Sequence, residues 1–318
     1  MELKIIFNSL YKDAPATMNY SDAFSFNENI YISDSNNYEE FNIALFMPYE
    51  KDLEALLRTK KLHPHIKVGL IDPRGTLNND IIQAVDFFIV DSIEMTDFLS
   101  KYSKPYCIFY EYPHFETNIK KQENREHITI AYHGNKVHLE EMHPRVTNAL
   151  FDLSMKYPLE FIAIYNVEQL RKWDFDFPTN FKIQHVQWYE GVYNDVLASA
   201  DIGIIPALIP SVDSNDSGDY NLNFKMPSNP GRLIVLTKLG IPVVADFLPS
   251  HFQFIDHGIN GFLAYSTSGW YSSLENLILN PSLRKEFATK MLIGIKDKID
   301  YKTQNFRLNK FLLKLLND

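Results

Sequence analysis

Short apolar runs alternate with segments of mixed polarity along most of this chain. A continuous apolar run predicts a buried strand, whereas apolar residues at helical spacing predict a helix. In the first part of the chain, strands are predicted at Leu3–Phe7, Ile43–Met47, Ile66–Ile71, Phe87–Val90 and Pro105–Tyr110. Helices are predicted between them, and residues 11–40 predict loop with some short helix. This alternation is typical of a parallel sheet covered by helices on both faces.

The alternation pauses at residues 114–127, a polar and charged stretch that we interpret as a linker. It then resumes, with strands predicted at Ile128–Tyr132, Leu159–Ile164, Phe181–Val186, Ile202–Ile205 and Val243–Ala245. One long helix is predicted at about 139–157. The sequence therefore predicts two α/β domains, at 1–113 and 128–295, and a length of 318 residues fits that number.

Residues 296–318 are predicted to form a separate C-terminal segment with an amphipathic helix. Its apolar side chains are Leu308, Phe311, Leu312, Leu315 and Leu316, and its cations are Arg307, Lys310 and Lys314. Such a helix either packs across the other domain or lies on an anionic membrane surface, and the pattern leaves both open. No apolar run approaches the roughly 18 residues of a membrane span, and the amino terminus lacks the usual form of a signal peptide. We therefore expect a cytoplasmic protein, peripheral at the inner face of the membrane if this helix binds lipid.

The composition narrows the classes of partner. A formal net charge of −9 and an isoelectric point of about 5.6 argue against a general nucleic-acid-binding protein. Cys107 is the single cysteine, so no intrachain disulfide can form, and this count fits a reducing compartment. We therefore expect no nucleic-acid partner.

The stretch at 223–246 is a polar loop followed by an apolar helix, a turn and a buried strand. Lys225, Asn229 and Arg232 cluster where the helix begins, and Pro230 suits its first turn. A helix N-terminus offers unpaired N–H groups and a partial positive charge, which together favour an anion. The pattern fits a phosphate clamp, and it equally fits an ordinary helix with solvated charges at one end.

Four short segments of the second half match one family in order and spacing. The first is YHGN at 132–135, and the second is VQWY at 186–189 with ADIGIIP at 200–206. The third consists of Lys225, Asn229 and Arg232 followed by LGIPVVA at 239–245, and the fourth is HGINGFL at 257–263. Together they resemble the nucleotide-binding domain of GT-B glycosyltransferases, in the group 1 or family-4-like set. The resemblance covers about residues 128–290. The first domain shows no motif of this kind.

The resemblance implies two Rossmann-like parallel-sheet domains with the ligand cleft between them. It implies a glycosyltransferase of the hexosyltransferase type, which moves a sugar from a nucleotide-diphosphate sugar to a glycan or lipid-linked acceptor in surface polysaccharide synthesis. The residues expected to be catalytic are Lys225, Arg232 and His133, and those expected to bind substrate are Gly134, Asn135, Val186, Gln187, Trp188 and Asn229. The cations are expected to stand in for a bound metal, so no metal and no cofactor are expected.

One departure from the family pattern keeps other functions open. Many members carry paired glutamates around this helix, and Pro227 and Val235 stand at the corresponding positions here. The alternatives are a non-catalytic or partner-dependent nucleotide-sugar-binding module of the same fold, and a nucleotide-sugar epimerase. The acidic stretch at 213–219 is interpreted as a loop that gates the acceptor.

Overall fold

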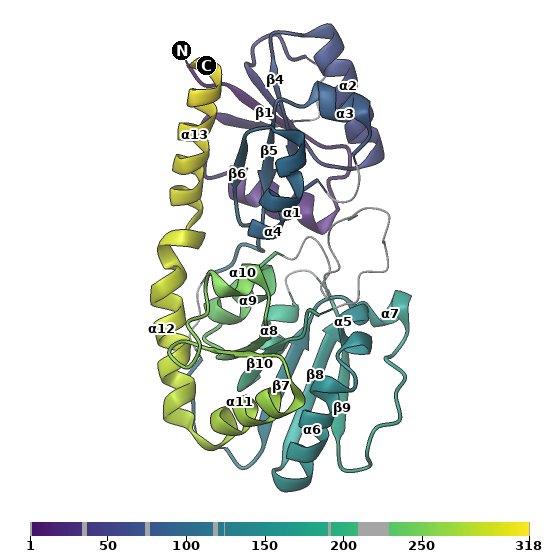
Figure 1. The fold of residues 1–318 in the computed structure, drawn as a ribbon, viewed down its shortest axis with the longest axis vertical. Coiled ribbons are helices and arrows are strands. Elements are labelled where there is room, and N and C mark those ends of the chain that lie inside the picture. Colours follow the sequence, from purple (N-terminus) through teal and green to yellow (C-terminus); the bar gives the residue numbers. More distant parts are fainter. Residues whose placement is uncertain are drawn as a thin grey trace. The chain divides into compact units, whose positions relative to one another are not determined.

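The computed structural model describes residues 2–33, 37–73, 77–116, 120–123, 125–189, 192–208 and 229–317 (Figure 1). These residues divide into two compact units. Unit 1 contains Met1–Phe115, Asn229–Gly231 and Asp297–Asp318, and unit 2 contains Glu116–Ser228 and Arg232–Lys296. Each unit has its own sheet and is described by itself.

Unit 1 is built on six parallel strands. They are β1 Ile5–Asn8, β2 Ile30–Ile32, β3 Ile43–Phe46, β4 Lys67–Ile71, β5 Phe87–Val90 and β6 Tyr106–Ile108. Their order across the sheet is β2-β1-β3-β4-β5-β6, and every neighbouring pair is parallel. Strands β1, β3 and β5 are buried along their whole length, which explains why they are apolar throughout.

Two of the helices of unit 1 begin at a short polar residue that caps them. The helices of this unit are α1 Pro15–Phe24, α2 Glu50–Leu62, α3 Asn79–Ala84, α4 Ile93–Leu99 and the 3-10 turn η1 Ser100–Tyr102. The Asn78 side chain accepts a hydrogen bond from the backbone of α3, and Ser92 does the same for α4. The segment 11–40 is more ordered than predicted, because it holds all of α1 and β2. The buried side chains of α1, Tyr20 and Phe24 among them, join the core of this unit.

The last helix packs against unit 1. Helix α12 spans Pro281–Ile299, and α13 spans Tyr301–Asn317. The Tyr301 hydroxyl donates to the Tyr112 carbonyl, and the Gln304 amide exchanges two hydrogen bonds with the backbone of Tyr110. Leu308 and Leu312 are fully buried. The apolar side of the predicted amphipathic helix therefore lies against protein. None of the helices in the described ranges is long and apolar enough to cross a membrane.

Unit 2 is built on a second sheet of six parallel strands. They are β7 Ile128–His133, β8 Leu159–Tyr165, β9 Lys182–Gln187, β10 Ile202–Ile205, β11 Val243–Asp246 and β12 Phe262–Ala264. The order across the sheet is β12-β11-β10-β7-β8-β9. The chain thus builds outward from β7 in one direction, returns to the other side of β7 at β10, and continues outward. This is the strand order of a Rossmann fold, so the predicted pair of parallel-sheet units is confirmed.

The helices of unit 2 show where sequence periodicity misleads. They are α5 Lys136–Glu141, α6 Arg145–Lys156, α7 Val167–Leu170, α8 Tyr193–Leu197, α9 Gly231–Lys238, α10 Pro249–Phe252 and α11 Thr267–Leu279. The single helix predicted at 139–157 was wrong, because Pro144 cannot continue α5 and stands instead at the start of α6. A glycine follows α9 and closes its C-terminal end. Gly240 has φ 72°, its N–H bonds to the Thr237 carbonyl, and Ile241 N–H bonds to the Leu236 carbonyl.

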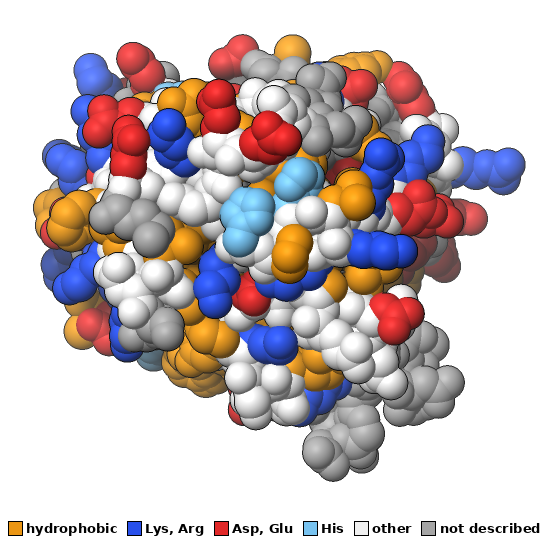
Figure 2. Space-filling model, turned by 90° about the horizontal axis from the view of Figure 1, so that it is seen from above, with side chains coloured by type: hydrophobic (Ala, Val, Ile, Leu, Met, Phe, Trp, Pro, Cys, Tyr) orange, Lys and Arg blue, Asp and Glu red, His pale blue; other side chains and the backbone are white. Residues whose placement is uncertain are grey.

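Residues 120–123, within the stretch interpreted as a linker, are fastened to unit 2. The Lys120 ammonium donates to Asp201 Oδ1 at 2.9 Å and to two neighbouring backbone carbonyls. The fully buried Arg284 of α12 donates to the Glu123 carbonyl at 2.7 Å and to Gln122 Oε1 at 3.1 Å. On the surface, Lys and Arg side chains are mixed with Asp and Glu over the face shown in Figure 2.

Candidate functional site

The strand order of unit 2 places a crevice at one point of its sheet. In open parallel sheets, ligands bind outside the carboxyl ends of the strands, where the strand order reverses. Here that point lies between β7 and β10. His133 is the last residue of β7, Gly134 follows it, and Pro206 follows β10. The predicted site residues His133 and Gly134 therefore lie at this point.

His133 is a buried, neutral imidazole. Only 7% of its surface is exposed, and its Nε2 lies 3.5 Å from the Arg232 carbonyl oxygen. Burial, together with the positive charge of Arg232, lowers the pKa of His133 to about 3. The ring can therefore accept or donate a hydrogen bond at neutral pH, but it does not carry a positive charge there.

Gly134 has a backbone conformation that other residues rarely adopt. Its φ is 140°, and a Cβ at this position would lie 2.8 Å from the Tyr132 hydroxyl oxygen and 3.1 Å from Arg232 Cδ. A side chain is therefore excluded by both strain and space. The bare backbone of Gly134 lies directly beside Arg232, which suits close approach of a phosphate.

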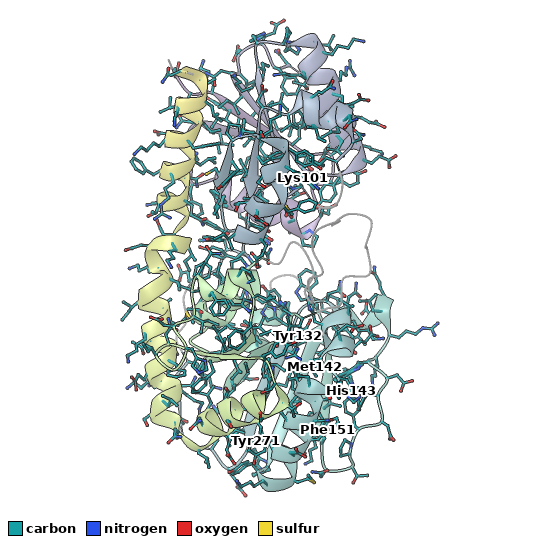
Figure 3. All side chains as sticks on the ribbon, viewed as in Figure 1. Lys101, Tyr132, Met142, His143, Phe151 and Tyr271 are labelled. Carbon is teal, nitrogen blue, oxygen red and sulfur yellow. The ribbon has the colours of Figure 1, made fainter. Side chains whose placement is uncertain are left out.

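Arg232 is the second residue of α9 and is partly buried. Its Nη1 donates to the Pro206 carbonyl at 3.1 Å, and its guanidinium carbon lies 5.9 Å from the centre of the Tyr132 ring. Tyr132 is labelled in Figure 3. Burial lowers the pKa of Arg232, while Tyr132 and Asp246 act in the opposite direction. A guanidinium has five N–H donors in a flat fork, so this side chain can still hold a phosphate.

Asp246, at the end of β11, organises the loop that receives Arg232. Its side chain is fully buried and pairs with both terminal nitrogens of Arg145. Asp246 Oδ2 also accepts from the N–H groups of Ala207 at 2.8 Å and Leu208 at 3.0 Å, and Oδ1 accepts from the Trp270 indole at 3.2 Å. These bonds hold the backbone just after Pro206, whose carbonyl contacts Arg232.

An aromatic ladder joins the ends of β7 and β9. The rings of His133 and Tyr193 stack with centres 5.8 Å apart, and those of Tyr193 and Trp188 stack at the same spacing. Trp188 is half-buried, so part of its ring remains accessible. The ladder brings the predicted residues His133 and Trp188 into one group.

Two predicted substrate-binding side chains are engaged elsewhere. The Asn135 side chain caps α5 by accepting from Val137 N–H at 3.2 Å. Gln187 accepts from Glu168 N–H at 2.8 Å and donates to the Trp188 carbonyl. Val186, in β9, is half-buried beside Ile164. Their side chains thus support local structure, and their backbones lie at the same edge of the sheet as His133.

Asn229 lies in unit 1, at a second pocket. Its amide donates to Glu111 Oε1 at 2.9 Å, and the Asn19 amide donates to the other oxygen of the same carboxylate. These residues line a cavity of about 410 Å³ at the carboxyl ends of the unit 1 strands, together with Asp72 after β4 and Tyr49 before α2. Lys225 and the acidic stretch at 213–219 lie outside the described residues.

Several residues that shape these sites were not predicted from the sequence. They are Tyr132, Arg145, Tyr193 and Asp246 in unit 2, and Asp72 and Glu111 in unit 1. The available signal was polar residues directly after apolar strands, as at Asp72 and Asp246. No group of three or more His, Cys, Asp or Glu side chains within the described ranges is arranged to hold a metal ion.

Comparison with known proteins identifies the fold. No protein-family model matches the chain, and no curated protein matches its sequence significantly. Among solved structures, the lipopolysaccharide outer core galactosyltransferase WaaB aligns with a TM-score of 0.63 and 11% identity, over 99% of this chain and 99% of its own. HepE from Anabaena, in complex with UDP and glucose, aligns with a TM-score of 0.61 and 11% identity, over 98% and 100%. A glycosyltransferase from Rickettsia africae aligns with a TM-score of 0.66 and 9% identity, over 100% of both chains. At these identities the likeness concerns the fold, and the chain has the two-domain, Rossmann-like GT-B fold of these glycosyltransferases.

Proposed function

We propose that this protein is a hexosyltransferase that moves a sugar from a UDP-sugar to a glycan or lipid-linked acceptor. The observation that carries the proposal is the position of Arg232. Its side chain passes beside the bare backbone of Gly134, with Cδ 3.1 Å from where a Cβ would stand, at the point where the strand order of a Rossmann-like sheet reverses. Two of the structures with this fold, HepE and GtfA, were solved with UDP and a sugar, which supports UDP as the nucleotide.

The chemistry makes a cation at this position useful. When the bond between the anomeric carbon and the diphosphate oxygen breaks, the electron pair and a negative charge go to the leaving UDP. The acceptor hydroxyl oxygen bonds to the anomeric carbon and loses its proton. Arg232 stabilises the diphosphate charge as it develops, and a partly buried site strengthens that interaction. Losing one such donor typically costs on the order of 10²–10³ in rate.

The other residues of the ladder and turn have roles in the same proposal. Neutral His133 hydrogen-bonds the sugar or the diphosphate without adding charge, and Gly134 lets the phosphates approach the backbone. The accessible part of Trp188 offers a flat surface on which the uracil ring packs. Lys225 is proposed as a second cation for the diphosphate. In unit 1, the cavity lined by Glu111, Asp72 and Asn229 is proposed to receive the acceptor hydroxyl.

Calorimetric titration tests the proposal. UDP, UDP-glucose and UDP-N-acetylglucosamine are titrated into the wild type, Arg232→Gln and Lys285→Gln, an exposed lysine of α12 that serves as the charge-matched control. We expect Arg232→Gln to weaken UDP binding by about ten- to hundredfold, since a hydrogen bond to a charged group is worth about 1.5–3 kcal/mol. Lys285→Gln should bind as the wild type does. If no UDP compound binds, or if the two variants bind alike, the proposal is wrong.

One observation favours a second candidate, a nucleotide-sugar-binding module without turnover. Val235 stands where many family members carry one of the paired glutamates, and its side chain is buried in the core on α9. Release of UDP from a UDP-sugar by the purified chain would exclude this candidate. We propose that the protein is located in the cytoplasm. Membrane contact through α13 stays a prediction, which flotation with anionic vesicles tests.

A further inference from the structure

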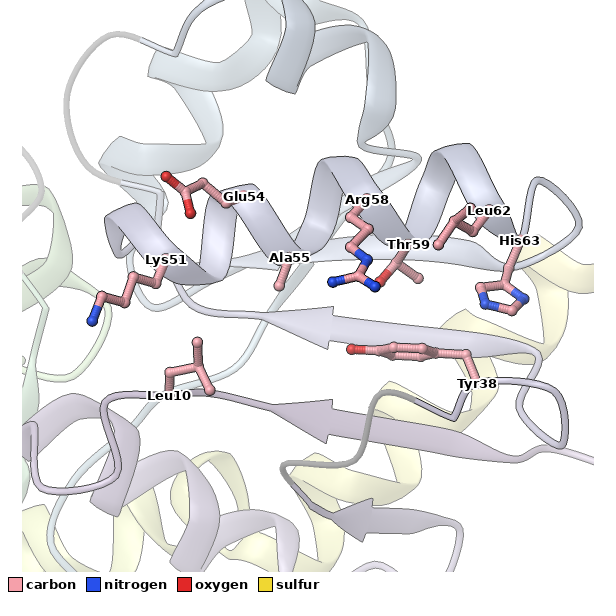
Figure 4. Close-up of a pocket in the computed structure, with 9 residues that line it drawn as sticks. All are labelled: Leu10, Tyr38, Lys51, Glu54, Ala55, Arg58, Thr59, Leu62 and His63. Carbon is pink, nitrogen blue, oxygen red and sulfur yellow. The ribbon is translucent and has the colours of Figure 1, made fainter.

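A groove runs along one face of α2 in unit 1, apart from the residues assigned above. Its volume is about 380 Å³. The wall formed by α2 and its C-cap residue His63 contains seven residues whose helical spacing places them along one face, namely Lys51, Glu54, Ala55, Arg58, Thr59, Leu62 and His63. Leu10 and Tyr38 form the facing wall, and Figure 4 shows all nine.

Two cations, Lys51 and Arg58, and one carboxylate, Glu54, line the groove. Arg58 and His63 point from α2 toward Tyr38, whereas Glu54 points away from Leu10 and Tyr38 (Figure 4). Within the described residues, neither Lys51 nor Arg58 has an ion pair or a side-chain hydrogen bond. The lining therefore carries one more positive than negative formal charge in a protein with a net charge of −9, and among the described residues Glu54 forms no ion pair with either cation.

Both walls of the groove are held in place by buried hydrogen bonds. Asp52, which is 1% exposed, accepts from the Ser9 hydroxyl at 2.7 Å and from Leu10 N–H at 2.8 Å, and so ties Leu10 to α2. On the other side, the Tyr38 hydroxyl accepts from the Asn8 amide at 2.6 Å. The groove is therefore preorganised, which lowers the entropy lost when a ligand binds.

The groove and the cavity proposed for the acceptor have lining residues close together at the start of α2. Tyr49 lines that cavity and stands two residues before Lys51. The rings of Tyr11 and Tyr49 lie 4.8 Å apart, next to Leu10. Lys51 and Arg58 are about 10 Å apart along the helix axis, a distance longer than one sugar ring. An extended acceptor would therefore run from the cavity past Lys51 toward Arg58.

We propose that the α2 groove binds an acidic stretch of the acceptor glycan, with phosphate or carboxylate groups at Lys51 and Arg58. This proposal rests on the proposed function, since it extends the acceptor site. The exposed side chains of Leu10 and Leu62 contact the apolar faces of the sugar rings. A saccharide chain fits better than an anionic membrane. A saccharide in the groove interacts mainly with the nearby cations. A broad anionic membrane surface would also be repelled by the net negative charge of the rest of the protein.

Binding of saccharide probes to the full chain tests the groove. Trigalacturonate supplies carboxylates, glucose 6-phosphate supplies phosphate, and maltotriose is the neutral probe. We expect at least one acidic probe to bind, more weakly at high salt, and maltotriose to bind far less. Arg58→Gln should weaken that binding about tenfold or more, as expected for a charged hydrogen bond. Lys61→Gln removes one charge from the same helix outside the groove and should leave binding of the acidic probe unchanged.

UDP is titrated into the same samples to separate the two proposals. If UDP binds but neither acidic probe does, if maltotriose binds as well as they do, or if Arg58→Gln and Lys61→Gln behave alike, the groove proposal is overturned. Arg58-dependent binding to phosphatidylglycerol vesicles without saccharide binding also overturns it, in favour of a membrane surface. Arg58-dependent binding of an acidic probe without UDP binding supports the groove and overturns the proposed function.

Discussion

Asp246→Asn is the most informative single change in unit 2. The substitution keeps the shape of the side chain and removes its charge. One oxygen becomes an NH₂ group, which cannot accept a hydrogen bond. If the NH₂ group takes the place of Oδ2, the bonds from Ala207 and Leu208 are lost, and if it takes the place of Oδ1, the bond from Trp270 is lost. Arg145 loses one of its two bonds in either case. The buried end of Arg145 loses its counter-charge in either case.

The structure sets the size of the effect. Removing one partner of a buried ion pair costs about 3–5 kcal/mol. The Arg145 side chain retains 19% exposure, so water can solvate part of it and we expect the lower end, about 3 kcal/mol. For a unit of this size that corresponds to a fall in Tm of about 6–12 °C. The Pro206 carbonyl loses support as well, so UDP binding should weaken about fivefold, or roughly 1 kcal/mol.

Asp201→Asn is the matched control. Asp201 is also fully buried, pairs with Lys120 at 2.9 Å and accepts from Thr129 N–H at 3.0 Å. It precedes β10, however, and so lies at the opposite edge of the sheet from Pro206. Urea unfolding and UDP titration of both variants should show two destabilised proteins, of which only Asp246→Asn binds UDP less well.

Two results would refute this reasoning. The ion-pair argument is wrong if Asp246→Asn unfolds at the same urea concentration as the wild type. If both variants lose UDP affinity equally, the loss reflects general destabilisation, and Asp246 does not position Arg232. The double variant Asp246→Asn with Arg145→Met should recover part of the lost stability, because it removes the unpaired cation.

Three further predictions follow from single residues. Gly134→Ala should cost about 1–3 kcal/mol of stability and weaken UDP binding. Gly258→Ala is the control, because Gly258 also has a positive φ, 77°, but has nothing within 4 Å of its Cβ position, so UDP binding should stay intact. Equal UDP binding by the two variants would contradict the steric argument. The pKa of His133 is lowered to about 3 and that of His251 to about 4, so below about pH 6.5 the unfolded chain binds protons that the folded chain does not. Stability should therefore fall from about pH 6.5 toward about 4, by about 1.4 kcal/mol per pH unit for each histidine, and His133→Gln should remove one of these contributions in urea unfolding. Tyr301→Phe should lower the free energy of unfolding by about 1–2 kcal/mol, because Tyr112 loses its buried hydrogen-bond partner. Phe306→Leu is the control and should change stability little, because the Phe306 side chain is 71% exposed. An equally large loss in Phe306→Leu would count against packing of α13 on unit 1.

The sequence predicts the sheets well because their strands are buried on both faces. The apolar runs predicted at Ile202–Ile205 and Val243–Ala245 are therefore continuous, and they lie in β10 and β11 of the structure. The edge strand β2 was missed, since Tyr31 and Ile32 are about half exposed and stand among polar residues. Periodicity alone also carried a helix through Pro144, although proline lacks the N–H that a continuing helix requires.

The candidate site was predicted only in part, because its chemistry depends on contacts between distant residues. His133, Gly134 and Arg232 each stand in a recognisable local pattern. The Asp246 pairing with Arg145 joins residues 101 positions apart, and nothing local in a single sequence marks such a pair. Similarly, Asn135 and Gln187 occupy motif positions, but only their hydrogen bonds reveal that the side chains are used to hold α5 and the segment at Glu168.

The environment of Arg232 supports the proposed phosphate clamp over an ordinary helix start. At an ordinary start the guanidinium would be solvated, and its pKa would keep its usual value. Here burial lowers the pKa, and the contacts made by the side chain are the neutral Pro206 carbonyl and Tyr132. Within the described residues, no carboxylate forms an ion pair with Arg232. A cation held this way carries a desolvation cost that a bound anion would offset. In the proposed function, a diphosphate at Gly134 supplies that counter-charge to a partly buried arginine at this point of the sheet.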